Sequence, residues 1–359
     1  MTAAERVRAE WQAVEPVETF WIQRAEAQQL QLTKPPGSLG RLEEIANRIC
    51  AIQKTLAPVV RCPSIYVFAA DHGVCAEGVN PYPPEVTAQM VVNFLSGGAA
   101  INVLARIGGA SLNVIDVGVA GGIPPRDGLI SRRVANGTNN FCCEPAMSRD
   151  DAVAALAVGM DCAEHAVNAG STVIGVGEMG IGNTTVASAI CSAITGLSPE
   201  ATCGRGTGAD DACLSRKISA VDRACALHLP YIKDTVDLLS RLGGLEIAAM
   251  CGACVGAARR RCAVLVDGFI ATAAAAVAVQ LNVNVRDYLF SAHRSTEPGQ
   301  AALLEYLRLR PLLDLEMRLG EGTGTALAIP LVRAGVEAFT GMASFASAGV
   351  SEASAGHGR

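Results

Sequence analysis

The residues of this chain that could do chemistry lie in polar, glycine-rich segments that directly follow apolar, strand-like runs. Residues 71–73 (Asp-His-Gly) follow one such run, residues 177–185 follow another, and His293, Ser295 and Glu297 follow a third. In open parallel sheets the carboxyl ends of the strands meet at one edge, and ligands bind just beyond it. We therefore expect these segments to form one binding site.

The segment after residue 174 contains a literal GxGxxG motif formed by Gly175, Gly177 and Gly180. As a dinucleotide fingerprint this motif is weak, because Glu178 would repel a pyrophosphate and no acidic residue ends a second strand about 20 positions later. The motif still leaves open an NAD-dependent oxidoreductase as an alternative function. A non-catalytic nucleotide sensor that uses the same loops is a second alternative.

A single phosphate suits this segment better than a dinucleotide. Gly180 and Gly182 allow backbone N–H groups to approach a phosphate, and a helix N-terminus favours an anion. We expect Asn183, Thr184 and Thr185 to cap the helix that follows. An ordinary tight turn with a helix cap is the alternative interpretation.

Two further loops have a similar composition, at residues 204–208 (GRGTG) and 320–325 (GEGTGT). Lys217 lies about two helical turns beyond the first, where it either reaches a phosphate as a point charge or is solvated. Glu321 in the second has glycine on both sides and apolar residues nearby, including Leu319. Such a carboxylate is either a solvated loop residue or a base with a raised pKa, and the sequence leaves both open.

Metal and thiol chemistry are poorly supported. Asp71, His72, His293 and Glu297 are a conceivable ligand set, but they form no compact ligand motif, so we expect neither a metal nor a cofactor. The 13 cysteines are scattered, and the CxxC at residues 251–254 lies in a helical pattern without a second CxxC. We expect most cysteines to be small buried apolar residues.

Composition excludes several classes of protein. Of 359 residues, 50% are apolar, 18% are charged and 4% are aromatic, and the net charge is -5, which gives no footprint for a nucleic acid. The most apolar run, residues 269–281, is too short to span a membrane and is predicted to be a buried helix. The N-terminus has no apolar core behind a basic start, so we expect a cytoplasmic location.

Runs of strand length alternate with helical patterns through the middle of the chain. The expected strands are residues 64–70, 111–117, 171–176, 262–266 and 287–292. The expected helices are residues 85–95, 100–107, 149–169, 184–194, 210–229 and 245–260. Nearly continuous hydrophobicity in the strands predicts an α/β fold, a parallel sheet with helices on both faces.

The chain ends differ from the middle, because charged amphipathic helix patterns dominate them. We expect a large α/β nucleotide- and base-binding domain at residues 61–300. Residues 1–60 and 301–359 are expected to form a small helical domain, with the loop near 318–325 at its edge.

Taken together, the loops resemble the nicotinate-nucleotide:dimethylbenzimidazole phosphoribosyltransferase family of cobalamin biosynthesis. The motifs that carry the resemblance span almost the whole chain. They are residues 32–43 (LTKPPGSLGRLE), 70–74 (ADHGV), 82–83, 86–94, 177–185 (GEMGIGNTT), 204–208, 243–250, 267–269, 293–295 and 318–324 (RLGEGTG).

The resemblance implies a Rossmann-like larger domain and a homodimer, and it assigns roles. Glu321 is similar to the family's catalytic base, and Glu178 to a residue beside the reacting sugar. The positions that resemble the pocket for the incoming base are Tyr82, Gln89, Met179 and Leu319. Those that resemble the phosphate and ribose site are Gly180, Gly182, Asn183, Thr184, Gly206, Lys217 and Ser295.

The activity implied is transfer of the 5-phosphoribosyl group from nicotinate mononucleotide to 5,6-dimethylbenzimidazole, giving alpha-ribazole 5'-phosphate and nicotinate. Asn80 stands where the family often has serine, and Gln300 where it often has histidine. These departures lie next to the expected base pocket, so the sequence leaves the physiological acceptor open.

Overall fold

The computed structural model describes residues 2–351. A six-stranded sheet has the order β3-β2-β1-β4-β5-β6, and every neighbouring pair is parallel. Its strands are β1 (Ser64–Ala70), β2 (Ser111–Gly118), β3 (Leu129–Ser131), β4 (Val173–Met179), β5 (Ala263–Val266) and β6 (Leu289–Ser291). The predicted α/β fold with a parallel sheet is confirmed.

The strand boundaries show which sequence signals were sufficient. All seven residues of β1 are buried, as its unbroken apolar run predicts. The predicted strand at 287–292 is shorter, because Val283–Tyr288 forms a 3₁₀ helix before β6. Strand β3 was missed, since it is a three-residue edge strand without a buried face. A separate two-stranded ladder, β7 (His293–Arg294) with β8 (Leu313–Asp314), was also missed.

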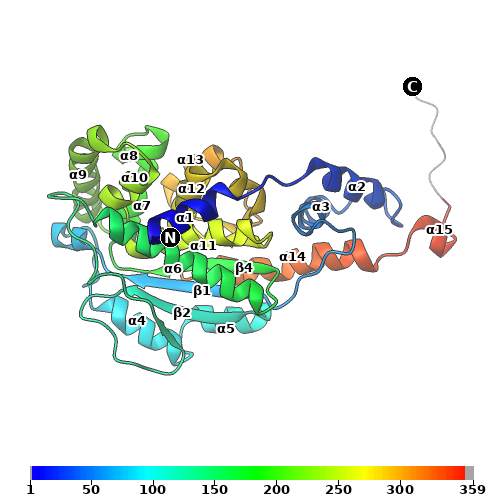
Figure 1. The fold of residues 1–359 in the computed structure, drawn as a ribbon, viewed down its shortest axis with the longest axis horizontal. Coiled ribbons are helices and arrows are strands. Elements are labelled where there is room, and N and C mark those ends of the chain that lie inside the picture. The colour runs from blue at the N-terminus through cyan, green and yellow to red at the C-terminus, as the bar shows by residue number, and fades with distance from the viewer. Residues whose placement is uncertain (1, 352–359) are drawn as a thin grey trace. The chain divides into compact units, whose positions relative to one another are not determined.

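Helices lie on both faces of the sheet (Figure 1). Helices α4 (Val86–Leu95) and α5 (Ala100–Gly108) connect β1 to β2. Helix α6 (Arg149–Asn168) lies in the connection from β3 back across the sheet to β4, α11 (Leu245–Arg259) lies between β4 and β5, and α12 (Phe269–Leu281) lies between β5 and β6. Right-handed crossovers place these two groups on opposite faces. The remaining helices of the described chain are α1 (Ala3–Gln12), α2 (Thr19–Gln29), α3 (Arg41–Gln53), α7 (Asn183–Thr195), α8 (Pro199–Thr202), α9 (Asp211–His228), α10 (Thr235–Leu242), α13 (Pro298–Leu307), α14 (Thr323–Gly341) and α15 (Phe345–Ala348).

One stretch, Val86–Gly108, is long and apolar enough to cross a membrane by length and composition. It is not one continuous helix, because α4 ends at Leu95 and α5 begins at Ala100, with Gly97 in the left-handed region at φ 78° between them. The predicted buried helix at 269–281 is confirmed as α12, in which only the last two residues are not buried.

The described chain divides into two compact units, one of residues 2–16 and 61–329 and the other of residues 17–60 and 330–351. These limits differ from the predicted domains, because residues 2–16 and 301–329 belong to the larger unit. Asn282 Nδ2 donates to the Trp11 carbonyl at 2.7 Å, and Tyr288 Oη donates to the Glu15 carbonyl at 2.9 Å, which tie the N-terminal segment to the α/β part. The loop at 318–325 also lies in the larger unit.

The smaller unit has a core of its own. Ala25 of α2, Ala46 and Cys50 of α3 and Phe339 of α14 pack together with Leu32. The chain segments that supply them come from both ends of the sequence. That this helical unit is an independent domain stays a prediction.

Candidate functional site

A cavity opens at the carboxyl ends of β4, β5 and β6, within the larger unit. Its lining comes from the segments that follow these strands and from the loop before α14. The lining residues include Asn80, Glu178, Met179, Gly180, Asn183, Thr184, Gly206, Asp267, His293, Ser295, Glu297, Arg318, Leu319 and Glu321.

The structure brings most of the predicted site residues to this cavity. Nine of the thirteen predicted positions line it: Glu321, Glu178, Met179, Leu319, Gly180, Asn183, Thr184, Gly206 and Ser295. The other four do not. Tyr82 and Gln89 are exposed side chains, Gly182 lies at the start of α7, and Lys217 lies behind the wall of the cavity.

The three Gly/Thr-rich loops meet here, although only residues 177–185 follow a strand of the six-stranded sheet; the other two follow α8 and β8. Residues 71–73, which were expected in the same site, do not line the cavity. Residues 180, 181, 183, 184, 206–207 and 320–321 contribute to the cavity wall. This convergence supports one ligand held by several loops.

The GxGxxG motif serves close packing of β4. Gly175 and Gly177 lie inside that strand, not in a strand-to-helix turn. A Cβ on Gly175 would lie 2.0 Å from Thr325 Cγ2, and one on Gly177 would lie 2.4 Å from the Gly322 nitrogen. These glycines therefore allow the loop before α14 to lie against the strand, and the dinucleotide fingerprint behind the oxidoreductase alternative is wrong.

The start of α7 differs from its prediction in one respect. Gly182, at φ 96°, is the N-cap, and no side chain accepts a hydrogen bond from the first turn. Asn183, Thr184 and Thr185 form that turn and do not cap it, so the prediction that they cap the helix is wrong. Within this turn, Asn183 N donates to the Gly180 carbonyl at 3.1 Å and Thr185 N donates to the Gly182 carbonyl at 3.0 Å. The positive end of the helix dipole still favours an anion beside it.

The buried side chain of Lys217 connects the 180–184 segment to the 204–208 loop by hydrogen bonds. Its Nζ donates to Thr184 Oγ1 and to the Gly204 carbonyl, both at 3.0 Å, and only 1% of the residue is exposed. Burial lowers the pKa of Lys217. Its ammonium lies next to Gly206, where a Cβ would be 3.3 Å from Nζ, so the predicted solvated alternative is wrong.

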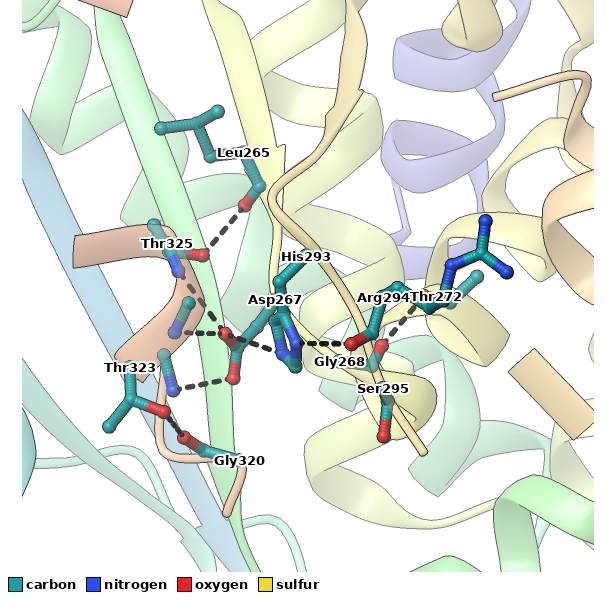
Figure 2. Close-up of polar contacts among 12 residues, drawn as sticks. Leu265, Asp267, Gly268, Thr272, His293, Arg294, Ser295, Gly320, Thr323 and Thr325 are labelled. Carbon is teal, nitrogen blue, oxygen red and sulfur yellow. Dashed lines mark hydrogen bonds and ion pairs between the residues drawn. The ribbon is translucent and has the colours of Figure 1, made fainter. Parts of the chain in front are cut away.

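The loop that carries Glu321 is held by a buried carboxylate (Figure 2). Asp267, the residue after β5, accepts hydrogen bonds from Gly322 N at 2.9 Å, Gly324 N at 2.7 Å and Thr325 N at 3.2 Å. Glu321 itself adopts φ 63°, a left-handed conformation that is uncommon for a residue with a side chain.

The two predicted reactive carboxyls are buried, each 6% exposed. Burial, followed by the charge of Asp267, raises the pKa of Glu321 to about 7. Its Oε2 is buried and has no hydrogen-bond partner among residues 2–351. Burial excludes the alternative of a solvated loop residue, and the role of Glu321 as a base stays a prediction.

Glu178 lies on the opposite side of the same loop. Burial and the charges of Glu246, Asp267 and Glu321 raise the pKa of Glu178 well above its ordinary value, although a hydrogen bond from Asn183 Nδ2 opposes the shift. A Cβ on Gly320 would lie 2.3 Å from Glu178 Oε1, so the glycine makes room for this carboxyl.

The conceivable metal ligands are not brought together. His72 Nε2 lies 2.9 Å from Glu246 Oε1 in a fully buried pair, and His293 Nε2 lies 3.7 Å from Asp267 Oδ1. Across residues 2–351, no cluster of three or more His, Cys, Asp or Glu side chains could hold a metal ion.

The cysteines follow their prediction for the most part. All 13 are free, and nine of them are buried. Cys251 and Cys254 lie in α11 with no exposed surface, and burial raises the pKa of Cys254 to about 12. A redox or zinc role for this CxxC is therefore unsupported.

Among the lining residues that are not predicted substrate-site positions are four polar ones: Asn80, Asp267, Glu297 and Arg318. Glu297 Oε1 accepts from Gly206 N at 2.8 Å, and Arg318 Nε donates to the Gly206 carbonyl at 3.2 Å. Asp267 had a usable signal, because it directly follows a strand as Asp71 does. The contacts of Arg318 depend on tertiary structure and have no sequence signal.

The arrangement suits a reaction in which positive charge develops. Four carboxyl side chains, Glu178, Asp267, Glu297 and Glu321, line one cavity, while an uncapped helix start and a buried lysine lie on one side of it. Buried acceptors with raised basicity can take a proton from a ligand. The site therefore fits an anionic group held beside a reacting centre that becomes cationic.

Comparisons with known proteins agree with this chemistry. A phosphoribosyltransferase family model matches residues 14–350. The nicotinate-nucleotide–dimethylbenzimidazole phosphoribosyltransferase of Chloroflexus aggregans is 52% identical over 328 residues, which cover 91% of this chain and 93% of that protein. The protein of the same name from Geobacter sulfurreducens is 51% identical over 337 residues, 94% of this chain and 96% of the relative.

Solved structures give the same result. The crystal structure of CobT from Thermus thermophilus is similar with a TM-score of 0.90 and 45% identity, over 93% of this chain and 100% of that one. A second structure from the same organism, described as nicotinate-nucleotide–dimethylbenzimidazole phosphoribosyltransferase, has a TM-score of 0.89 and 44% identity, over 94% and 100% of the two chains.

Proposed function

This chain belongs to the nicotinate-nucleotide–dimethylbenzimidazole phosphoribosyltransferase family, and from that premise we propose the reaction it catalyses. The enzyme transfers the 5-phosphoribosyl group of nicotinate mononucleotide to 5,6-dimethylbenzimidazole. The products are alpha-ribazole 5'-phosphate and nicotinate, and the first serves assembly of the cobalamin nucleotide loop. The observation that carries the proposal is the buried Glu321 carboxyl. Its pKa is raised, its Oε2 has no hydrogen-bond partner among the described residues, and it lines the same cavity as the three Gly/Thr-rich loops.

Glu321 acts as the general base. Nicotinate leaves as a neutral ring nitrogen when its bond to the anomeric carbon breaks, because that nitrogen already carries the positive charge. The benzimidazole forms the new bond through its bare ring nitrogen, and the N–H on its other nitrogen becomes strongly acidic. A carboxylate bonded to that N–H takes the proton and orients the ring for attack. Attack opposite nicotinate inverts the sugar to the α-configuration.

The phosphate is held without a metal by backbone amides at the start of α7 and by the 204–208 loop. The start of α7 at Thr184, where the Gly182 N-cap supplies no side-chain hydrogen bond, supports this assignment. Lys217 adds its charge from behind these loops and fixes their spacing through Thr184 and Gly204. Gly180, Gly182, Gly206 and Ser295 complete the assigned phosphate and ribose positions.

Glu178 lies beside the reacting sugar in this proposal. Burial and the charges of neighbouring carboxylates raise the pKa of Glu178, which favours its protonated form when no cation is bound. A cationic substrate would favour the ionised form of the same group. Glu178 thus supports an oxocarbenium-like state mainly once the cation is bound.

The acceptor base occupies the outer part of the cavity. Met179 and Leu319 line it, and Leu319 is 51% exposed, as expected for a side chain that a flat ligand covers. Tyr82 and Gln89 are assigned to the same pocket on resemblance to the family. Asn80 lines the cavity as well, so its departure from the family pattern falls where base preference is set.

Three further assignments rest on resemblance or on sequence composition. We assign the protein to the cytoplasm and to a homodimer, and we treat the smaller helical unit of residues 17–60 and 330–351 as a separate domain. Sedimentation at micromolar concentration tests the dimer, and a monomer there would remove that assignment.

Product analysis tests the function. Nicotinate mononucleotide is offered with a mixture of benzimidazoles and purines, and the products are identified by mass spectrometry and by the anomeric coupling in NMR. We expect equal amounts of nicotinate and an α-riboside phosphate of dimethylbenzimidazole. Binding of the nucleotide without turnover would instead indicate the sensor alternative.

A further inference from the structure

Asp267 holds the loop before α14 in place through hydrogen bonds to its backbone. The residue is 1% exposed and directly follows the last residue of β5, so its backbone is anchored in the sheet. Its two carboxylate oxygens receive three backbone N–H groups, from Gly322, Gly324 and Thr325. These residues closely follow Glu321 and lie at the start of α14.

We propose that Asp267 is the positioning residue for Glu321: its carboxylate fixes the loop in the conformation that aims Glu321 into the cavity, and its negative charge faces the Glu321 carboxyl. This inference rests on the proposed function. It adds a role for a residue that lines the cavity but has been given no part in binding substrate.

The geometric part follows from strain. Glu321 is held at φ 63°, and a left-handed residue with a side chain persists only when its surroundings over-determine it. Three hydrogen bonds to the Asp267 carboxylate hold the residues after Glu321 in place, and the close packing of Gly322 on Gly177 restricts the same segment. Charge-assisted bonds of this kind are stronger than bonds between neutral groups.

The electrostatic part concerns the groups around Glu321. Charged or titratable side chains reach the cavity from Asp267 after β5, Glu178 at the end of β4, His293 in β7, Glu297 before α13 and Arg318 on the same loop. Among these, Asp267 is the charge that raises the pKa of Glu321, in addition to burial. A like charge nearby favours the protonated form, so removing it lowers the pKa.

The test is the pH dependence of kcat for Asp267→Asn. Asparagine nearly preserves shape and one acceptor oxygen but removes the charge. We expect the acid limb of the profile to move to lower pH by about one unit, while kcat at its plateau falls about 100-fold because the loop is held less well. The KM for nicotinate mononucleotide should change much less than kcat.

The matched control is Asp116→Asn. Asp116 is a buried carboxylate at the end of β2 that accepts from Val119 N at 2.9 Å, but it does not line the cavity. We expect it to lower the melting temperature without moving the acid limb. A merely structural role for Asp267 predicts that both variants behave alike.

Circular dichroism checks the fold of each variant, and Asp267→Ser replaces Asp267→Asn if the amide clashes with Gly322 N. An unmoved or raised acid limb in a folded Asp267 variant would overturn the proposal, and so would failure of both variants to fold, which would make Asp267 a general folding determinant. Absence of turnover in the wild-type protein would instead contradict the proposed function itself.

Discussion

Gly177 of β4 packs so closely against Gly322 that a Cβ on Gly177 would lie 2.4 Å from the Gly322 nitrogen and 2.7 Å from the Glu321 carbonyl carbon. A strand position that reads as part of a nucleotide fingerprint thus serves as the surface on which the Glu321 loop rests. The geometry of Glu321 therefore depends on a residue that is distant in sequence.

Gly177→Ala should displace this loop. The contacting atoms are backbone, which cannot rotate away, so we expect kcat to fall about 100-fold, with lower thermal stability. Gly341→Ala is the control, because nothing lies within 4 Å of a Cβ there, and it should leave kcat unchanged. Steady-state kinetics and melting curves of both variants check this, and wild-type kcat in Gly177→Ala would contradict it.

Parallel strand ends explain how far the sequence could predict this molecule. Runs such as residues 64–70 are buried on both faces, so their hydrophobicity alone marks the strands, and the polar segments after them necessarily meet at one edge. That reasoning correctly brought Glu178, Ser295 and Glu297 to one edge, whereas Asp71 and His72 do not line the cavity and the Glu321 loop follows no strand of that sheet.

Contacts across the fold were beyond such reasoning. Arg318 bonds to Gly206, and Asp267 bonds to three amides more than 50 positions away; nothing in the local sequence indicates either partner. The sequence also did not reveal that Gly177 and Gly180 have different roles, because both belong to the same GxGxxG motif. Gly177 lies inside β4, whereas Gly180 follows the strand.

The pH dependence of wild-type turnover should show an acid limb near pH 7. The base must be deprotonated to take the proton, and the pKa of Glu321 is raised to about 7. Turnover therefore falls as the pH drops below that value. We expect kcat measured between about pH 5 and 9 to show this limb; a limb near 4.5, the ordinary glutamate value, would contradict a base of raised pKa.

The free energy of unfolding should also depend on Glu321, but it should decrease with rising pH whereas turnover increases. Because the folded-state pKa of Glu321 is raised above its unfolded value, the folded state binds the proton more tightly, and stability decreases as the pH rises from about 4.5 to about 7. Glu321→Gln removes this penalty, so the variant should be more stable than wild type above pH 7, by at most about 3 kcal/mol. The difference should vanish near pH 4, and denaturant melts at both pH values measure it.

Lys217→Ala should weaken nucleotide binding. Losing a buried charge that spaces the Thr184 and Gly204 segments should raise the KM for nicotinate mononucleotide about 5- to 100-fold, equivalent to about 1 to 3 kcal/mol. Lys233→Ala, at an exposed position away from the cavity, is the control. An unchanged KM, or loss of wild-type activity on treatment with a chelator, would contradict the metal-free phosphate site.

Turnover by Glu321→Gln is the most direct test of the central claim, that Glu321 takes the proton from the incoming base. The amide preserves the size of the side chain but cannot accept that proton at neutral pH. We predict that the variant binds nicotinate mononucleotide and dimethylbenzimidazole with wild-type affinity by calorimetry, while kcat falls by about 10² to 10⁴. Turnover within a few-fold of wild type would contradict the account.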